Sequence, residues 1–177
     1  ADIRQVLALA RREGLKPVIA GGGEAWRVAE ELARAGVPVV LNPLYNLPGN
    51  FDTLGRRLDN AALLRKAGVT IAFSSGENHN ARKVRQAAGN AVAHGLPWAE
   101  ALAAITSAPA EIFGLGARGR IDTGAVADLV LWSGDPLEVT SLADQVWIGG
   151  EDRPLRSRQT ELRDRYFQRL QTGAPSP

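Results

Sequence analysis

Glu77 and His79 are the residues in this sequence best suited to acid–base or metal chemistry. They lie in the segment 74–82, Ser-Ser-Gly-Glu-Asn-His-Asn-Ala-Arg, where a carboxylate and an imidazole two residues apart could share a metal ion. Glu77 could instead orient His79 as a general base. The structural alternative is that His79 caps the following helix and donates to a backbone carbonyl. His94 precedes a glycine at a predicted helix end, where an imidazole favours the helix dipole, so we interpret it as structural.

A second candidate region is the segment 42–57, which is long for a connection between a strand and a helix. Loops of more than about 12 residues are commonly functional or disordered. We expect Asn42 and Tyr45 to contact a small-molecule substrate, together with Asn78 and Arg82 from the segment 74–82. The alternative is a packed excursion that has no role in binding.

The third region is the run Gly21-Gly22-Gly23, which opens a predicted helix. Glycines before a helix can let backbone N–H groups approach a phosphate, and an independent phosphate-binding α/β domain is therefore one hypothesis. The spacing is not G-x-G-x-x-G, so the dinucleotide signal is weak. The plainer interpretation is a tight turn from strand to helix.

All three regions follow strands of a unit that repeats three times: an amphipathic helix, a glycine and a short apolar strand. The helices are predicted over 2–14, 24–36 and 59–68, and the strands over 16–20, 37–41 and 69–73. Strands that alternate with helices and are continuously apolar predict a parallel sheet covered on both faces. Because function in such sheets lies at the carboxyl ends of the strands, we expect the three regions to share one edge.

The rest of the chain predicts more helices and two further strands. A helix over about 80–94 has an apolar face, and Pro97 begins another whose inward residues are Trp98, Ala101, Leu102 and Ile105. On the first predicted helix the apolar face consists of Ile3, Val6, Leu7 and Ala10. Short strands follow over 129–132 and 145–148, then a helix over 160–171 and a tail over 172–177 that we expect to be disordered.

Composition excludes several classes of protein. The 177 residues are too few for a complete (β/α)8 barrel, which needs about 250. The absence of cysteine excludes disulfides and thiolate metal sites, and no apolar run approaches the roughly 20 residues of a membrane helix. The net charge is only +2 and the charged C-terminal segment alternates in sign, which argues against nucleic-acid binding. The chain has no methionine, so we expect a removed leader or a piece of a longer polypeptide.

The segment 106–132 carries the most specific pattern. It contains Thr-Ser-Ala-Pro-Ala at 106–110, Phe-Gly-Leu at 113–115, Gly-Arg-Ile at 119–121 and Ala-Asp-Leu-Val-Leu-Trp at 127–132, followed by Gly-Asp-Pro-Leu at 134–137. This resembles the connection between the last barrel helix and the outer β-sandwich of the amidohydrolase superfamily. The segments 16–43 and 68–82 are similar to its imidazolonepropionase-like and Xaa-Pro-dipeptidase-like branch.

The resemblance implies an α/β fold that is the last part of a (β/α)8 TIM-type barrel, with about three parallel strands. Residues 1–123 would form the C-terminal part of the barrel, 124–158 the strands of the composite sandwich, and 159–177 a terminal helix and tail. The family's ligands for one or two divalent metals, often zinc, are a His-x-His pair, a His or Lys from middle strands and a final Asp. This chain has no His-x-His; the later His position falls near Ala20 or Gly21, and the Asp position near Gly76.

Two functional hypotheses follow. The first is a fragment of a metal-dependent hydrolase of amide or cyclic-amide C–N bonds, with Glu77 and His79 as catalytic residues and His79 as a metal ligand. This chain alone would bind no metal and would need the missing N-terminal barrel segment or another subunit. The second is a non-catalytic, degenerate half-barrel that binds a partner or completes a subunit. We also expect a homo-oligomer. The high ratio of Arg to Lys indicates a GC-rich bacterial source, and we expect the protein in the bacterial cytoplasm or periplasm.

Overall fold

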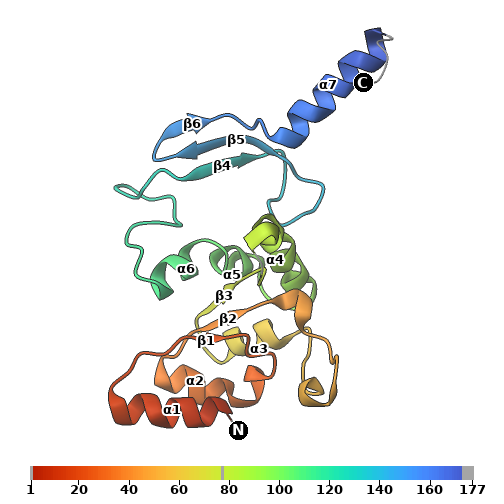
Figure 1. Ribbon diagram of the computed structural model, residues 1–177. Helices are drawn as coiled ribbons and strands as arrows, with labels where there is room; N and C mark the ends of the chain where they lie inside the picture. The colour runs from red at the N-terminus through yellow and green to blue at the C-terminus, as the bar shows by residue number, and fades with distance from the viewer. Residues whose placement is uncertain (1, 77, 173–177) are drawn as a thin grey trace.

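A computed structural model describes residues 2–76 and 78–172, which contain two three-stranded sheets (Figure 1). The helices are α1 (Asp2–Glu13), α2 (Ala29–Ala35), α3 (Asn60–Lys66), α4 (Val84–Ala93), α5 (Trp98–Ala103), α6 (Ser107–Ile112) and α7 (Arg158–Thr172). The 3-10 turns are η1 (Ala25–Val28), η2 (Pro43–Tyr45), η3 (Phe51–Thr53) and η4 (Asn78–Lys83). The strands are β1 (Ile19–Ala20), β2 (Val39–Leu41), β3 (Ile71–Phe73), β4 (Leu129–Trp132), β5 (Ala143–Ile148) and β6 (Glu151–Arg153).

The first sheet is parallel, with the order β1-β2-β3, and it confirms the parallel pairing predicted from the repeats. Ile19, Val39 and Ile71 share one row, and Ala20, Val40 and Ala72 share the next. Helices α1, α2 and α3 lie on one side of this sheet, and α4, α5 and α6 lie beyond β3 (Figure 1). The sheet and helices α1 to α5 share one core, which includes Leu32, Val39, Leu41, Leu64, Ile71, Ala88, Leu96 and Ala101.

The strands end where predicted but begin two or three residues later, and before β2 a proline limits the ladder. Pro38 has no N–H, and it enters the ladder only as the acceptor of the Ile19 amide at 3.0 Å. Gly21 follows β1 with φ +92°, a left-handed conformation that ends the strand. The predicted helices over 24–36 and 80–94 likewise begin as the 3-10 turns η1 and η4 before α2 and α4.

Two predictions of inward side chains were wrong. Trp98 at the start of α5 is 42% exposed, because its indole faces the loop 134–137 and donates to Asp135 there. Val6 is 38% exposed, because α1 packs on the core through the neighbouring Leu7. The other expected inward residues of α5, headed by the fully buried Ala101, are in or against the core.

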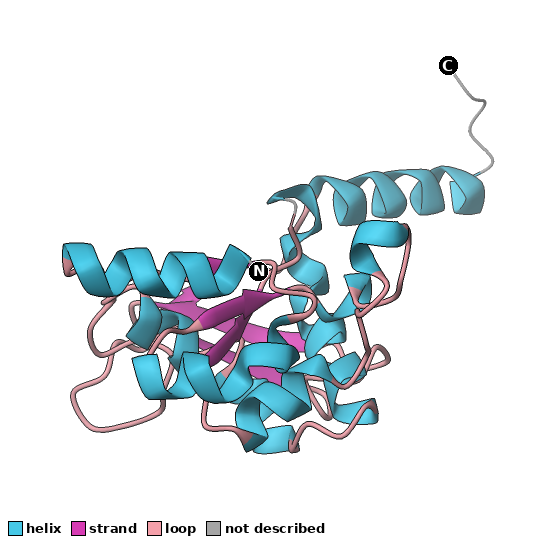
Figure 2. Cartoon of the chain, turned by 90° about the horizontal axis from the view of Figure 1, so that it is seen from below, coloured by secondary structure: helices cyan, strands magenta, loops and turns pink. Residues whose placement is uncertain are grey.

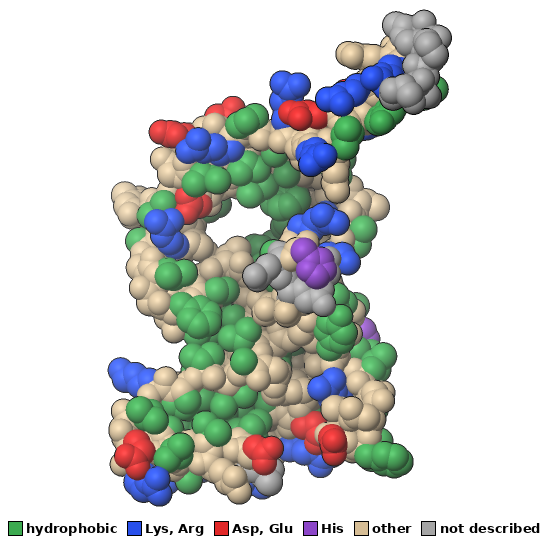
Figure 3. All heavy atoms as spheres, viewed as in Figure 1, with side chains coloured by type: hydrophobic (Ala, Val, Ile, Leu, Met, Phe, Trp, Pro, Cys, Tyr) green, Lys and Arg blue, Asp and Glu red, His purple; other side chains and the backbone are tan. Residues whose placement is uncertain are grey.

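The second sheet is antiparallel, with the order β4-β5-β6. The sequence did not predict β6, because its Glu-Asp-Arg stretch is entirely exposed and has no apolar alternation. It forms because Gly149 and Gly150, with φ +61° and +82°, turn the chain back on β5. Figure 3 shows a hollow between this sheet and the α/β part of the molecule.

Helix α7 extends away from the body (Figures 1 and 2). It begins two residues earlier than predicted, after a cap in which Ser157 Oγ accepts from the Thr160 amide at 3.2 Å. The predicted disordered tail lies, from residue 173 onward, outside the described residues. None of the described helices is long and apolar enough to cross a membrane.

Candidate functional site

The three regions singled out in the sequence follow the carboxyl ends of β1, β2 and β3. Because Ala20, Val40 and Ala72 lie in one row of a parallel sheet, the loops that follow them leave from the same edge. Two residues further on, Asn42 and Ser74 continue the face of Val40 and Ala72, because strand side chains alternate with a period of two. This edge is the candidate site.

Asn42 connects two of the three loops. Its side-chain Nδ2 donates to the carbonyl of Ser75 at 3.0 Å, and its Oδ1 accepts from the Leu44 amide at 3.2 Å. The side chain is half-buried. Asn42, predicted as a substrate contact, therefore lies in the site and fixes the loop after β3 to the loop after β2.

Gly76 has a backbone conformation that suits glycine. Its φ is +73°, its amide donates to Ser74 Oγ at 3.1 Å, and an added Cβ would lie 3.4 Å from Asn42 Nδ2. A side chain at this position is strained in that conformation. The position at which the resemblance expects a metal-binding Asp therefore has a backbone conformation that favours glycine.

The structure gives fewer contacts for the other predicted site residues. Glu77 lies outside the described residues. Asn78, His79 and Arg82 belong to the turn η4, and the side chains of His79 and Arg82 are exposed. Tyr45 is 63% exposed in η2. Their predicted roles in catalysis, metal binding and substrate binding remain predictions.

His94 has a structural contact that matches its interpretation. It is the C-cap of α4, and its Nδ1 lies 2.8 Å from the carbonyl oxygen of Asn90, one turn earlier. That distance fits a hydrogen bond from a protonated Nδ1 to the last turn of the helix.

The glycine turn after β1 is held by a buried amide. Asn60 on α3 is fully buried; its Nδ2 donates to the Gly22 carbonyl at 3.0 Å and its Oδ1 accepts from the Trp26 amide at 3.1 Å. The turn leads into the short 3-10 turn η1, and its N-cap residue, Glu24, carries a carboxylate. This carboxylate is paired with Arg27 at 2.9 Å. The positive φ of Gly21 and Gly22 fits the tight-turn interpretation for these two glycines.

Two arginines pack against Trp26, in the turn η1 that follows β1. Arg27 and Arg57 lie over the Trp26 ring, with guanidinium carbons 4.8 and 4.9 Å from its centroid. Arg57 also binds Asp59 at 2.5 and 2.6 Å. These hydrogen bonds lower the pKa of Asp59 and raise the pKa of Arg57.

Sequence reasoning did not single out Arg56, although it belongs to the predicted loop 42–57. Its Nη1 donates to the Tyr45 carbonyl at 3.2 Å, and its half-buried side chain crosses Gly23, in the turn after β1. The signal in the sequence was the third glycine of the run, because a Cβ at that position would collide with this arginine.

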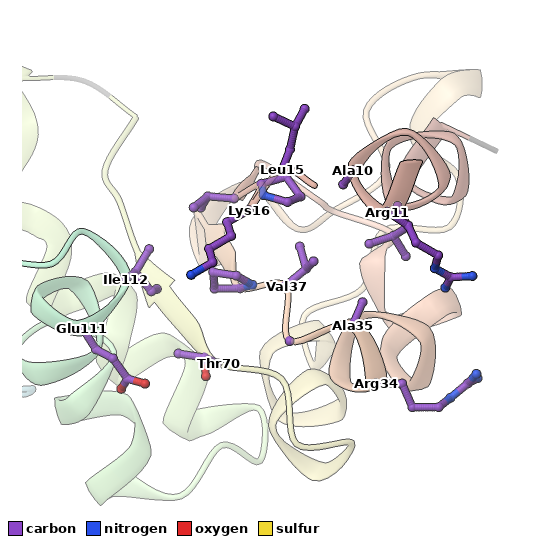
Figure 4. A pocket seen from close by; sticks show the side chains of 15 residues that line it. Ala10, Arg11, Leu15, Lys16, Arg34, Ala35, Val37, Thr70, Glu111 and Ile112 are labelled. Carbon is purple, nitrogen blue, oxygen red and sulfur yellow. The ribbon is translucent and has the colours of Figure 1, made fainter. Parts of the chain in front are cut away.

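A groove of about 650 Å³ lies at the other end of the strands (Figure 4). Its lining includes Pro17, Val18, Pro38 and Thr70, which precede the three strands. Arg11 and Arg34 direct their guanidinium groups away from Glu111 across the groove. In parallel α/β folds this end serves stability rather than chemistry, so the groove is not the candidate site.

The described residues do not by themselves fit a catalytic metal. Residues 2–76 and 78–172 contain no group of three or more His, Cys, Asp or Glu that could hold an ion. At the strand ends, Ala20, Gly21 and Gly76 offer no side-chain donor, and the Asn42 amide is already engaged. A catalytic zinc needs three protein ligands and an open position.

Comparison with known proteins gives consistent matches. Residues 10–152 match the model of the amidohydrolase family. The chain is 46% identical over 90 residues to the amidohydrolase tasK of Hapsidospora irregularis, a match that covers 50% of this chain and 9% of that protein.

Two solved structures share the fold. The amidohydrolase from Thermotoga maritima is 31% identical, with a TM-score of 0.80, over 88% of this chain and 41% of that one. A zinc-bound adenosine deaminase from Xanthomonas campestris is 22% identical, with a TM-score of 0.62, over 94% of this chain and 46% of that one. The chain thus spans less than half the length of these relatives. With 143 consecutive residues inside the family match, this chain belongs to the amidohydrolase family.

Proposed function

We propose that this chain is the C-terminal part of a hydrolase that cleaves C–N bonds in amides or cyclic amides. The observation that carries the proposal is the family match over residues 10–152, which includes the whole parallel sheet and its carboxyl-end loops. In this proposal residues 1–123 supply the last three strands of a (β/α)8 barrel and 124–158 supply sandwich strands. Water is added across the C–N bond, and the proton goes to the nitrogen that leaves.

The amidohydrolase family is generally metal-dependent, and the Xanthomonas campestris relative contains zinc. Because the described residues do not by themselves fit a metal, we assign no step to one here. The proposal places the remaining ligands on another part of the protein, with His79 and Glu77 as this chain's contribution. The chain alone is then expected to be inactive.

The open edge of the first sheet supports a requirement for additional strands. Ile19 and Gly21 direct their amides toward β2, so the backbone groups of Ala20 between them face the opposite edge. The hollow in Figure 3 is bordered by apolar side chains on the side of the second sheet. We propose that the rest of the barrel, from the same polypeptide or another subunit, pairs with β1 and fills this hollow.

Native mass spectrometry with metal analysis tests the proposal. The protein expressed from its complete reading frame is compared with residues 1–177 alone, and each is assayed on a panel of N-acyl amino acids and cyclic amides. Divalent metal and hydrolysis in the complete protein only would support the proposal. A complete protein that contains metal and hydrolyses none of these compounds would contradict it.

A non-catalytic half-barrel is the second candidate function. It is favoured by Gly76, whose φ of +73° is rarely adopted by residues with a side chain, and by the Asn42 amide, which is engaged in holding the loop after β3. It predicts that even the complete protein retains no metal after dialysis against zinc. Retained zinc at one or two ions per chain would exclude it.

A further inference from the structure

Arg56 and the backbone beside it have hydrogen-bond donors without an acceptor among the described residues. A guanidinium has five N–H donors, and within residues 2–76 and 78–172 the Arg56 side chain makes one hydrogen bond, to the Tyr45 carbonyl at 3.2 Å. Other arginines around it are paired: Arg27 with Glu24 at 2.9 Å and Arg57 with Asp59. Within the described residues, Arg56 has no carboxylate within ion-pair distance.

The neighbouring backbone supplies two more donors. The Gly21 amide donates to the Val40 carbonyl and the Ala25 amide to the Gly22 carbonyl, both at 2.9 Å. The amides of Gly22 and Gly23 have no acceptor within the described part of the chain. A half-buried cation beside two free amides is chemically suited to an oxyanion.

Gly23 makes room for this arrangement. Its φ lies outside the left-handed region, so the backbone does not require glycine there. The requirement comes from Arg56, because a Cβ at position 23 would lie 2.8 Å from its Nε and 2.9 Å from its Cγ. Gly21 and Gly22, in contrast, have φ of +92° and +55°. The third glycine of the run is thus explained by the passage of the arginine across the turn.

We propose that Arg56, with the backbone amides of Gly22 and Gly23, binds a carboxylate of the substrate. This deepens the proposed function, on which it rests, by naming the substrate class: amides that carry a free carboxylate, such as N-acyl amino acids or dipeptides. The planar guanidinium presents paired N–H groups that match the two oxygens of a carboxylate. Binding there would hold the substrate at the carboxyl ends of β1 and β2, beside the loop that carries Glu77 and His79.

The test measures binding and does not depend on turnover. The protein from the complete reading frame is titrated calorimetrically with N-acetyl derivatives of glycine, leucine, phenylalanine and proline, each as the free acid and as the primary amide. The wild type is expected to bind acids at least about tenfold more tightly than the matching amides. Arg56→Met is expected to remove this preference, and Arg56→Lys to reduce it, because an ammonium lacks the paired geometry.

A glycine variant tests the geometry while Arg56 stays in place. Gly23→Ala introduces a methyl group against the flexible arginine, so the protein should fold but lose the preference for acids. Gly49→Ala in the neighbouring loop is the matched control, because a Cβ there meets nothing within 4 Å. Arg34→Met, on the exposed surface of α2, controls for loss of a positive charge.

The outcomes separate the two proposals. Equal affinity for acids and amides in the wild type, or a preference that persists in Arg56→Met, would overturn the carboxylate site. A site that binds inorganic phosphate and none of the acids would also overturn it. Acid preference that depends on Arg56 without any hydrolysis would support the site and contradict the proposed hydrolase function.

Discussion

Gly89 in α4 faces the carbonyl oxygen of Leu137 so closely that a Cβ on Gly89 would lie 2.4 Å from that oxygen. Leu137 is buried in the core of the α/β part, although it belongs to the loop between β4 and β5. The Gly-Asp-Pro-Leu segment at 134–137 thus anchors the second sheet to the helices that follow the parallel strands. Its Asp135 accepts the Trp98 indole N–H at 2.9 and 3.0 Å.

Replacing Gly89 by alanine should destabilise the protein by about 1–3 kcal/mol, because the methyl group forces α4 and the loop apart. The sign of this change in the free energy of unfolding is informative, because alanine normally stabilises a helix interior by about 0.5–1 kcal/mol relative to glycine. Urea unfolding followed by circular dichroism measures the change. The control is Gln86→Ala on the same helix, expected within about 0.5 kcal/mol of wild type. A stabilised Gly89→Ala protein would contradict the close approach.

Arg85, also in α4, should be the principal polar anchor of the same loop. Its guanidinium donates to the carbonyls of Pro136, Glu138 and Ser141 at 3.1, 2.6 and 3.0 Å, and it lies 4.9 Å from the Trp132 ring centroid. Arg85→Met should cost about 2–3 kcal/mol, since three carbonyls, two of them in part-buried hydrogen bonds, lose a charged donor.

Arg85→Lys should recover only part of that stability, because one ammonium cannot reach all three carbonyls and stack on Trp132. Thermal unfolding and hydrogen exchange of the 136–141 amides would measure the effect. Unchanged exchange in Arg85→Met would show that the loop is held by other contacts.

Asn60→Ala is expected to destabilise the protein by about 1–3 kcal/mol, because the Gly22 carbonyl and the Trp26 amide lose their partner in a fully buried place. The loss should appear together with faster hydrogen exchange in the glycine turn after β1. Asn90→Ala on α4 is a suitable control, since that side chain is only half-buried. Equal stability losses in the two variants would argue against a special role for Asn60.

The contribution of Asp59 to stability should depend on pH. Hydrogen bonding to Arg57 lowers the Asp59 pKa below its ordinary value of 3.8, so the folded state favours the carboxylate. The stabilisation is fully present above the unfolded pKa and is lost as the pH falls through the folded one. Asp59→Asn should therefore be less stable than wild type at pH 7, with a difference that shrinks below about pH 4. The pair is partly exposed, so the effect should be small and weakened by salt.

Melting temperatures between pH 2 and pH 8 check this prediction. Asp152→Asn on the exposed strand β6 controls for the loss of one surface charge. A stability difference that is constant across the pH range would mean that the Asp59 variant acts through packing and not through its charge.

Local patterns predicted much of the fold. The three repeats of helix, glycine and apolar strand predicted the parallel sheet, because side-chain periodicity and the left-handed glycines after the helices at 14, 36 and 68 are properties of neighbouring residues. The strand β4 and most of β5 were also predicted. The strand β6 was not, since a fully exposed edge strand need not be apolar.

The family signature could be recognised in the sequence, but the contacts that its side chains make could not. Asp128, in the Ala-Asp-Leu-Val-Leu-Trp stretch, binds Arg118 at 2.6 Å and the Gly149 amide at 2.8 Å, a contact across 21 positions. Trp98 was predicted to face the core because an apolar helical stripe does not reveal a carboxylate that arrives 37 positions later.

The sequence by itself determined the periodic elements, the family and the three loops of the candidate site, because each depends on short-range spacing. Only the tertiary structure decided which side chains of those loops and of the neighbouring helix contact one another. Asn42 holds the loop after β3, Asn60 holds the turn after β1, and Arg56 crosses Gly23 and donates to the Tyr45 carbonyl. The physical reason is that a side chain's partner is set by the packing of distant segments, which local propensity does not encode.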